Sequence, residues 1–350
     1  MFSKLTTKLL IDEIAQQPLA RWFSGKGFTP QHLNGKLGIL GVPFGKGQNK
    51  KGKDEAGLKM APDFIRQTGF LSVLESLGMD LHDCGNVNYV PECSLQANNM
   101  HNLDHFAPLA LEVSTAVSNI LESYRGCLCL GGDHSIATGS IYGHMQVAGP
   151  KNVAVIYVDA HADINTSATS PSGNIHGMTV AMLAEEIRPL WPGSAVPGLD
   201  WLAPCLPLKN VAFIGLRSVD PGEARFLWQN NVAAFSMEDI GKCGIHKVLC
   251  KALTAIDPSS SKSIHLSFDI DSLDSLEAPC TTAPVRGGLT LREGIEICET
   301  VSRTGRMSVV DLVEVNPAIG TEIQRQTTLD AAKNVLLAMF GHSRRGNMKL

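Results

Sequence analysis

The sequence has little charge of either sign and no long apolar run. Its 350 residues include 18% charged residues, with a formal net charge of -4 and no run of basic residues. Such a chain gives no electrostatic reason to bind nucleic acid or a membrane surface, so we expect neither as a partner. No apolar stretch approaches the roughly 20 residues that a membrane-spanning helix needs. The expected partner is a small molecule.

The sequence also lacks a disulfide pattern and the glycine-rich loops that bind nucleotides. Its nine cysteines are an odd number at irregular spacing, and some, such as Cys127 and Cys129, lie in apolar strand-like runs. This pattern favours buried thiols in a reducing compartment. Gly131-Gly132 alone could suggest a nucleotide loop, but neither GxGxxG nor GxxxxGK[ST] accompanies it. Nucleotide binding is therefore the weaker interpretation.

Residues 1–30 are interpreted as an extension that precedes the folded domain. Lys4 and Lys8 stand among apolar residues there, which is typical of an amphipathic transit helix. Asp12 and Glu13 argue against import, because transit peptides contain few acidic residues. A mitochondrial transit segment and a cytoplasmic N-terminal helix both remain open.

Strands and helices alternate along residues 31–350. The predicted strands are 36–42, 79–84, 127–130, 153–158, 211–214, 233–236, 264–268 and 307–313. The predicted helices are 61–77, 107–124, 136–146, 178–190, 221–229, 244–254, 291–300 and 328–340. This alternation predicts an α/β fold with one parallel sheet of about eight strands and helices on both faces. No repeat or linker divides the segment, so we expect a single domain.

Six side chains that can bind metal follow three of the predicted strands. They are His134, then Asp159, His161 and Asp163, then Asp269 and Asp271. Alternate residues of an extended chain point the same way, and ligands bind at the carboxyl ends of parallel strands, so all six can converge. Four adjacent carboxylates would repel one another severely unless cations neutralise them. The sequence therefore predicts a dinuclear metal site.

An oxygen-rich site with two imidazoles suits Mn²⁺, although Fe²⁺, Co²⁺, Ni²⁺ and Zn²⁺ are not excluded. Two ions about 3.5–4 Å apart would lower the pKa of a shared water, which makes hydrolysis the natural reaction class. A single Asp-Xaa-His at a strand end is more often a cap or an ion pair. Three such clusters at the end of one sheet favour a metal-binding site instead.

Longer motifs around these clusters resemble the ureohydrolase superfamily, and within it the arginases. The motifs are Gly131-Gly-Asp-His134, Val158-Asp-Ala-His-Ala-Asp-Ile-Asn-Thr166, Ser172-Gly-Asn-Ile-His-Gly177, Ser267-Phe-Asp-Ile-Asp271 and Gly287-Gly-Leu-Thr-Leu-Arg-Glu-Gly294. The similarity runs from about Leu37 to Met348. It implies an arginase/deacetylase-like catalytic domain over residues 31–350. The implied enzyme has two Mn²⁺ per subunit and converts L-arginine and water to L-ornithine and urea through a metal-bridging hydroxide.

The resemblance also implies how the ligands divide between the two ions. One ion would be held by His134, Asp159, Asp163 and Asp269, and the other by His161, Asp159, Asp269 and Asp271. Glu314 matches the carboxylate that binds the guanidinium, a task for which paired hydrogen bonds suit it. His176 matches a proton-shuttling histidine. Glu314, His176 and Asp163 are the predicted catalytic residues.

The remaining substrate contacts implied by the resemblance concern the amino-acid end of arginine. The α-carboxylate would be held by Asn165, Ser172 and, through water, Ser170, with Asn174 in the same polar loop. Asp220 and Glu223 would lie near the α-ammonium. Agmatine lacks the carboxylate, so arginine is the favoured substrate, and an agmatinase or another guanidino-acid ureohydrolase is the alternative.

The chain departs from the arginase pattern in the predicted pocket. Thr282 and Ala283 stand where arginases usually carry glycine and threonine, and Ser218 replaces an aspartate. None of these changes removes a metal ligand, so we expect an active enzyme of arginine metabolism, for example in a urea cycle. A catalytically weak, regulatory arginase-like protein is the alternative of another class.

Arginases are commonly trimers. Arg292, Glu299 and Arg344 match charged residues of the trimer interface, although Gly241 stands where a partner aspartate is usual. The resemblance therefore implies a homotrimer.

Overall fold

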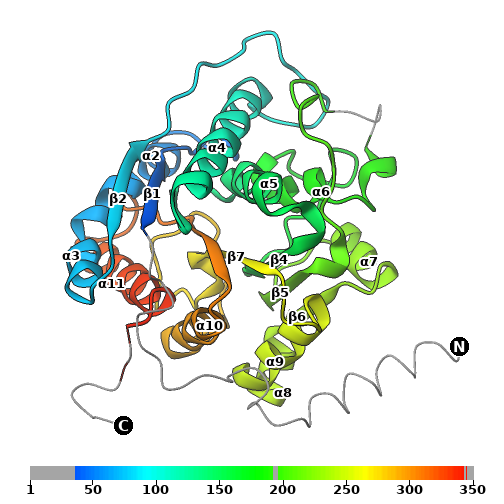
Figure 1. Ribbon diagram of the computed structural model, residues 1–350. Helices are drawn as coiled ribbons and strands as arrows, with labels where there is room; N and C mark the ends of the chain where they lie inside the picture. Colours follow the sequence, from blue (N-terminus) through cyan, green and yellow to red (C-terminus); the bar gives the residue numbers. More distant parts are fainter. Residues whose placement is uncertain (1–35, 192–195, 343, 345–350) are drawn as a thin grey trace, which may run out of the picture.

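An eight-stranded sheet forms the centre of the computed structural model, which describes residues 36–191, 196–342 and 344 (Figure 1). Its strands are β1 (Leu37–Val42), β2 (Leu81–Asn86), β3 (Gly126–Gly131), β4 (Val153–Val158), β5 (Val211–Leu216), β6 (Ala233–Ser236), β7 (Ser263–Asp269) and β8 (Met307–Val313). They lie in the order β2-β1-β3-β8-β7-β4-β5-β6, and each neighbouring pair is parallel. The predicted single-domain parallel sheet is confirmed. The expected extension over residues 1–30 lies outside the described residues.

The inner strands are buried on both faces, which explains their nearly continuous apolar sequences. In β4, Ile156 and Val158 belong to one core cluster, whereas Val155 and Tyr157 belong to the other. Successive strand residues point to opposite faces, so each cluster lies between the sheet and one layer of helices. The edge strand β2 differs, because five of its six residues are exposed.

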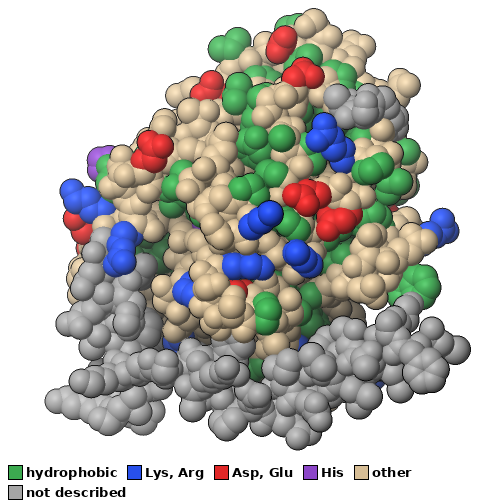
Figure 2. Space-filling model, turned by 45° about the vertical axis from the view of Figure 1, so that its right-hand side comes forward, with side chains coloured by type: hydrophobic (Ala, Val, Ile, Leu, Met, Phe, Trp, Pro, Cys, Tyr) green, Lys and Arg blue, Asp and Glu red, His purple; other side chains and the backbone are tan. Residues whose placement is uncertain are grey.

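Helices cover both faces of the sheet (Figure 1). The first cluster packs under α2 (Lys53–Gln67), α3 (Phe70–Ser76), α8 (Met237–Cys243), α9 (Ile245–Ile256), α10 (Leu291–Arg303) and α11 (Glu322–Met339). The second packs under α4 (Leu103–Ser123), α5 (Ala137–Ala148), α6 (Thr179–Leu183) and α7 (Pro221–Gln229). Within the described residues, no helix is both long and apolar enough to cross a membrane. Figure 2 shows basic and acidic side chains close together on one face of the molecule.

The predicted helices differ from the structure most clearly in two places, and one helix was missed. The predicted helix 61–77 is two helices, because Gly69 adopts a left-handed backbone with φ 75° between them. The predicted helix 178–190 ends at Leu183, since the next residue turns to form a bridge with Leu206. The short helix α8 was missed although Ser236 and Asp239 form a capping box at its start.

The carboxyl ends of five neighbouring strands carry the predicted site. His134 follows β3, Glu314 follows β8, Asp271 follows β7, Asp159 follows β4 and Asp220 follows β5. Because β3, β8, β7, β4 and β5 are consecutive in the sheet, residues far apart in sequence meet at one edge. This edge is where ligands bind in open α/β sheets.

Candidate active site

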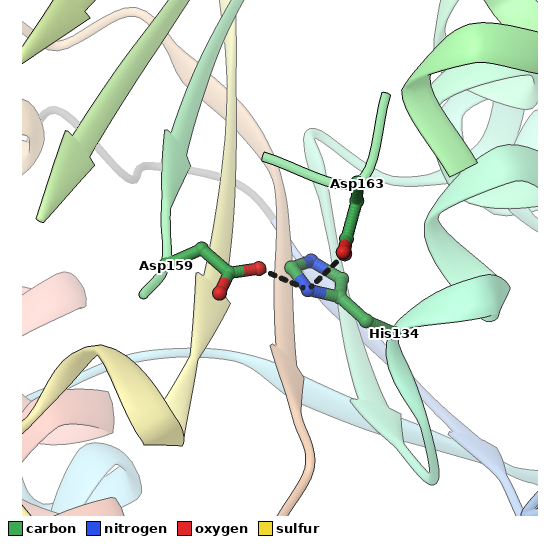
Figure 3. A group of neighbouring side chains, drawn as sticks. All are labelled: His134, Asp159 and Asp163. Carbon is green, nitrogen blue, oxygen red and sulfur yellow. Dashed lines mark ion pairs between the residues drawn. The ribbon is translucent and has the colours of Figure 1, made fainter. Parts of the chain in front are cut away.

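The ring of His134 faces three carboxylates. Its Nδ1 atom lies 2.9 Å from Asp159 Oδ2, 3.2 Å from Asp269 Oδ2 and 3.4 Å from Asp163 Oδ2. Figure 3 shows Asp159 and Asp163 pointing toward the imidazole. Neither His134 Nδ1 nor Asp159 Oδ2, both buried, has a hydrogen-bond partner among the described residues. These atoms converge on one point without satisfying one another, which is the geometry that a cation would complete.

A second group of ligands adjoins the first. His161 Nδ1 lies 3.3 Å from Asp159 Oδ1 and 3.2 Å from Asp271 Oδ2. Asp159 therefore presents one oxygen to each group, and either group could hold a metal ion. Asp269 Oδ2 faces the first group, and its Oδ1 accepts a hydrogen bond of 2.6 Å from the Asp271 amide, as Asp159 Oδ1 does from the His161 amide at 2.7 Å. Asp159 thus lies within 3.3 Å of both histidines, and the bridging roles expected of Asp159 and Asp269 stay predictions.

The electrostatics of the cluster also call for positive charge. Burial and the neighbouring Asp159 carboxylate raise the pKa of Asp163 to about 8. Burial and the carboxylates of Asp271 and Asp159 raise the pKa of Asp269 well above its ordinary value. Burial alone would lower the pKa of His134, but the neighbouring Asp159 and Asp269 carboxylates outweigh burial and raise that pKa. Carboxylates crowded in this way favour a bound cation that would neutralise them.

One pocket joins the metal-ligand cluster to most of the predicted substrate residues. Its lining consists of His161, Asp163, Asn165, Ser170, Ser172, His176, Gly177, Ser218, Asp220, Glu223, Asp269, Asp271, Ala283 and Glu314. Asn174 is not part of this lining, and its Oδ1 accepts a hydrogen bond of 2.8 Å from the Asn49 amide instead. The predicted role of Asn174 as a substrate contact stays a prediction, and its visible task is to tie two loops together.

Comparison with known proteins gives one consistent result. The model of the Arginase family matches residues 35–341. The chain belongs to the arginase family. It is 42% identical to the hepatic arginase of Aquarana catesbeiana over 89% of this chain and 94% of that protein. It is 40% identical to the mitochondrial arginase-2 of Homo sapiens over 89% of this chain and 86% of that protein.

Solved arginase structures share the fold. The crystal structure of arginase from Bacillus cereus superposes with a TM-score of 0.77 at 32% identity, covering 89% of this chain and 100% of that one. The arginase of Entamoeba histolytica, solved with L-ornithine, gives a TM-score of 0.75 at 28% identity, covering 88% and 98% of the two chains. The resemblance found from the motifs is confirmed, and the family match identifies a hydrolase of the arginase type.

In this arginase-family site, a series of buried side-chain hydrogen bonds orients His134 through its Nε2 atom. His134 Nε2 lies 2.9 Å from Ser267 Oγ, which donates to Asp311 Oδ2 at 3.2 Å. The same Asp311 oxygen lies 2.8 Å from His265 Nε2 and also accepts from Ser140. With Nε2 donating to Ser267, the lone pair of Nδ1 points at the carboxylate cluster, as a metal ligand requires. Sequence reasoning missed this support, although charged Asp311 inside an apolar strand was a signal.

Two further residues brace the cluster. The Tyr157 hydroxyl donates to Asp163 Oδ2 at 2.7 Å, and its ring stacks on His134 with centroids 4.3 Å apart. Arg217 donates to the backbone carbonyls of Asp271 at 2.6 Å and Val285 at 2.8 Å, which fixes the loop after β7. Tyr157 looks like an ordinary core residue in its strand, so nothing in the sequence separated it from the core.

Glu314 lies beside the cluster and contacts His176. The Glu314 side chain is 2% exposed, and its Oε1 lies 3.2 Å from His176 Nδ1 and 3.0 Å from the donating His134 amide. Burial would raise the pKa of Glu314, but its bonds to His176 and Thr282 outweigh burial and lower it. Its backbone has φ 62°, and that of Asp163 has φ 48°, both in the left-handed region. Such strain clusters at functional sites.

The far end of the pocket is held together by its own hydrogen bonds. Asn165 Nδ2 donates to Asp220 Oδ2 at 2.9 Å. Glu223 accepts from the amides of Ile164 at 3.0 Å and Asp220 at 2.9 Å, and burial raises its pKa to about 7. The hydroxyl oxygens of Ser170 and Ser172 accept from nearby amides, so their protons remain for a ligand. Glu223 therefore supports Asp220 more directly than it faces substrate.

Proposed function

We propose that this chain hydrolyses L-arginine to L-ornithine and urea with two Mn²⁺ ions bound per subunit. The observation that carries the proposal is the pair of adjoining ligand groups that share Asp159 and open into the same pocket as Glu314. Carboxylate oxygens with two imidazoles suit Mn²⁺ better than softer metals. Glu314 in that pocket suits a guanidinium.

The residues present fit two divalent cations. The buried Nδ1 of His134 and Oδ2 of Asp159 lack partners among the described residues, and both are common metal-ligand atoms. One ion would be held by His134, Asp159, Asp163 and Asp269, and the other by His161, Asp159, Asp269 and Asp271. When bound, the ions would supply Lewis acidity and lower the pKa of a water molecule toward neutrality.

The protein side chains would bind and orient the substrate. Glu314 would pair with the guanidinium through two charge-assisted hydrogen bonds. His176, whose side chain is 20% exposed and lines the pocket, would donate a proton to the departing amine. At the other end, Ser172 and Asn165 would hold the α-carboxylate, with Ser170 acting through water. Asp220 would accept the α-ammonium, with Glu223 behind it.

A substrate panel on the Mn²⁺-loaded protein tests this proposal. Urea release should be fastest from L-arginine and much slower from agmatine, which lacks the carboxylate, and from 4-guanidinobutyrate, which lacks the ammonium. Metal analysis of the same sample should find two ions per chain. Preferred hydrolysis of agmatine would support the agmatinase alternative. No urea from any of the three compounds would leave only a non-catalytic homologue.

The assembly proposed is a homotrimer. Arg344 Nε and Glu299 Oε1 lie 3.0 Å apart, and Arg344 Nη1 lies 3.5 Å from the Arg292 carbonyl oxygen. The three residues matched to the trimer interface thus form one polar cluster within a single subunit. Light scattering should give three times the mass of the chain, and a monomer would refute the trimer.

The domain boundary and the compartment are linked proposals. Residues 31–350 would form the catalytic domain, so a chain that begins at residue 31 should keep full urea release. Residues 1–30 would decide between mitochondria and cytoplasm. A fluorescent reporter fused behind residues 1–30 should enter mitochondria if they form a transit segment and should stay cytoplasmic if they do not. In either compartment, the proposed reaction would belong to arginine metabolism.

A further inference from the structure

The carboxylate of Glu314 contacts four hydrogen-bond donors, two at each oxygen. Oε1 accepts from the His134 amide at 3.0 Å and faces His176 Nδ1 at 3.2 Å. Oε2 accepts from Thr282 Oγ1 at 2.6 Å and from Gln48 Nε2 at 3.2 Å. An ionised carboxylate has about four acceptor positions, and a bidentate guanidinium needs two of them. A guanidinium can therefore enter only where two of the present donors leave.

The four donors differ in how easily they can leave. The His134 amide belongs to the backbone of a buried turn and cannot turn away alone. Thr282 is 8% exposed and makes the shortest of the four contacts. His176 lines the pocket on a side chain that is partly exposed. Gln48 Nε2 makes a long contact to Glu314 and also donates to Thr282 Oγ1 at 2.7 Å, so it keeps one partner when it leaves.

We propose that a guanidinium substrate replaces His176 at Oε1 and Gln48 at Oε2, while Thr282 and the His134 amide keep the carboxylate in place. The inference rests on the proposed binding of a guanidinium by Glu314. It makes Thr282 a positioning residue for that carboxylate. It also couples substrate entry to the release of His176 from Glu314, which places a proton donor beside the substrate only after the substrate is bound.

The backbone around Gln48 is fixed independently of its side chain. The neighbouring Gly47 amide donates to Asp133 Oδ2 at 2.7 Å, and Asn102 Nδ2 donates to the Lys46 carbonyl at 2.8 Å. Gln48 is 1% exposed, and its Oε1 atom has no partner among the described residues. Methionine has nearly the same length and no unsatisfied oxygen, so Gln48→Met should leave the loop in place while it removes one competitor of the guanidinium.

Kinetics of three threonine variants test the positioning role on the Mn²⁺-loaded enzyme. Thr282→Val should raise KM for L-arginine about tenfold or more, the usual effect of losing a hydrogen bond to a charged group. Thr282→Ser should restore KM, since it keeps the hydroxyl. Thr281→Val is the matched control, because the buried Thr281 hydroxyl has no partner among the described residues and its loss should not change KM.

The product L-ornithine separates positioning from general damage, because it carries no guanidinium. Its inhibition constant should be the same for the parent enzyme and Thr282→Val. Gln48→Met should lower KM for L-arginine, because it removes one competitor of the guanidinium. The inference is overturned if Thr282→Val leaves KM unchanged, if it weakens L-ornithine as much as L-arginine, or if Gln48→Met does not lower KM.

Calorimetry distinguishes failure of this inference from failure of the proposed reaction. If the parent protein releases no urea, the equilibrium binding of L-arginine can still be measured for both Thr282→Val and Thr281→Val. Weaker binding by Thr282→Val alone would support the inference although the proposed hydrolysis had failed. Equal binding by both variants would overturn it.

Discussion

Two parts of the site differ in how their polar side chains are satisfied. The ligand floor is the set His134, Asp159, His161, Asp163, Asp269 and Asp271. The tail wall is the set Asn165, Ser170, Ser172, Asp220 and Glu223. In the floor, His134 Nδ1 faces three carboxylates, and neither this nitrogen nor Asp159 Oδ2 has a hydrogen-bond partner among the described residues. In the wall, both oxygens of Glu223 accept backbone amides.

The difference indicates that the floor depends on a bound cation, whereas the wall does not. Buried carboxylates that face one another are costly unless a cation neutralises them, so the floor should lose its order and stability without metal. The wall is stabilised by hydrogen bonds of the protein itself and should persist in the metal-free protein. Substitutions in the floor should therefore change metal content, whereas those in the wall should change only substrate selection.

Asp163→Ala should have the largest effect. It removes a floor carboxylate that lies 3.4 Å from His134 Nδ1, so the variant should bind one metal ion instead of two. Urea release should fall by more than about 100-fold, beyond the loss typical of residues that only support a ligand. Metal analysis and initial rates check both effects. Asp80→Asn, on the surface, is the control, and two ions in Asp163→Ala would refute its place in the floor.

Ser267→Ala should weaken the floor without removing a ligand. The variant loses the partner 2.9 Å from His134 Nε2, so the ring can turn and its Nδ1 is no longer fixed toward the carboxylates. Loss of such a supporting hydrogen bond typically costs about 10–100-fold in metal affinity. Competition with a chelator measures the affinity. Ser263→Ala is the matched control on the same strand, since that hydroxyl contacts His144 instead; equal loss in both variants would contradict the argument.

Asp220→Asn should change the wall alone. Asparagine is as good a helix N-cap as aspartate, so α7 should keep its start while the pocket loses one negative charge. KM for L-arginine should rise about tenfold, because a hydrogen bond to a charged group becomes a neutral one. Inhibition by 4-guanidinobutyrate, which has no α-ammonium, should stay the same. A change in metal content would show that the wall and the floor are not independent.

The floor could be predicted from the sequence because its geometry follows from the parallel sheet. Residues two apart after a strand share a direction, and the carboxyl ends of neighbouring strands meet. Asp159 and Asp271 were expected together on this ground, and their groups do adjoin. The fold followed from the same alternation, with β4, β6 and β8 placed at their observed bounds.

The supporting contacts could not be predicted, because they depend on backbone turns and on the packing of distant segments. The left-handed φ of Glu314 has no signature in residue type. Gln48 meets Thr282 and Glu314 across more than 230 positions of the sequence. The helix expected over 178–190 ended early for a related reason, since its continuation was prevented by a bridge to Leu206.

Two buried histidines give a last test of the comparison. Floor carboxylates raise the pKa of His134, whereas burial and the nearby His265 lower the pKa of His144 to about 3. Between pH 3 and the ordinary value of 6.5, the unfolded chain binds a proton that folded His144 does not. Acid therefore favours unfolding, by up to about 1.4 kcal/mol per pH unit below pH 6.5.

His144→Gln should remove this dependence while it keeps a polar group near Ser263. The free energy of unfolding of the parent minus that of the variant, measured in urea from pH 5 to pH 8, should fall as the pH drops below 6.5 and stay constant above 7. Taking the difference cancels the floor groups, because they titrate in both proteins. A constant difference down to pH 5 would mean that His144 is protonated in the folded state. Burial away from the floor carboxylates would then not be enough to keep a histidine neutral.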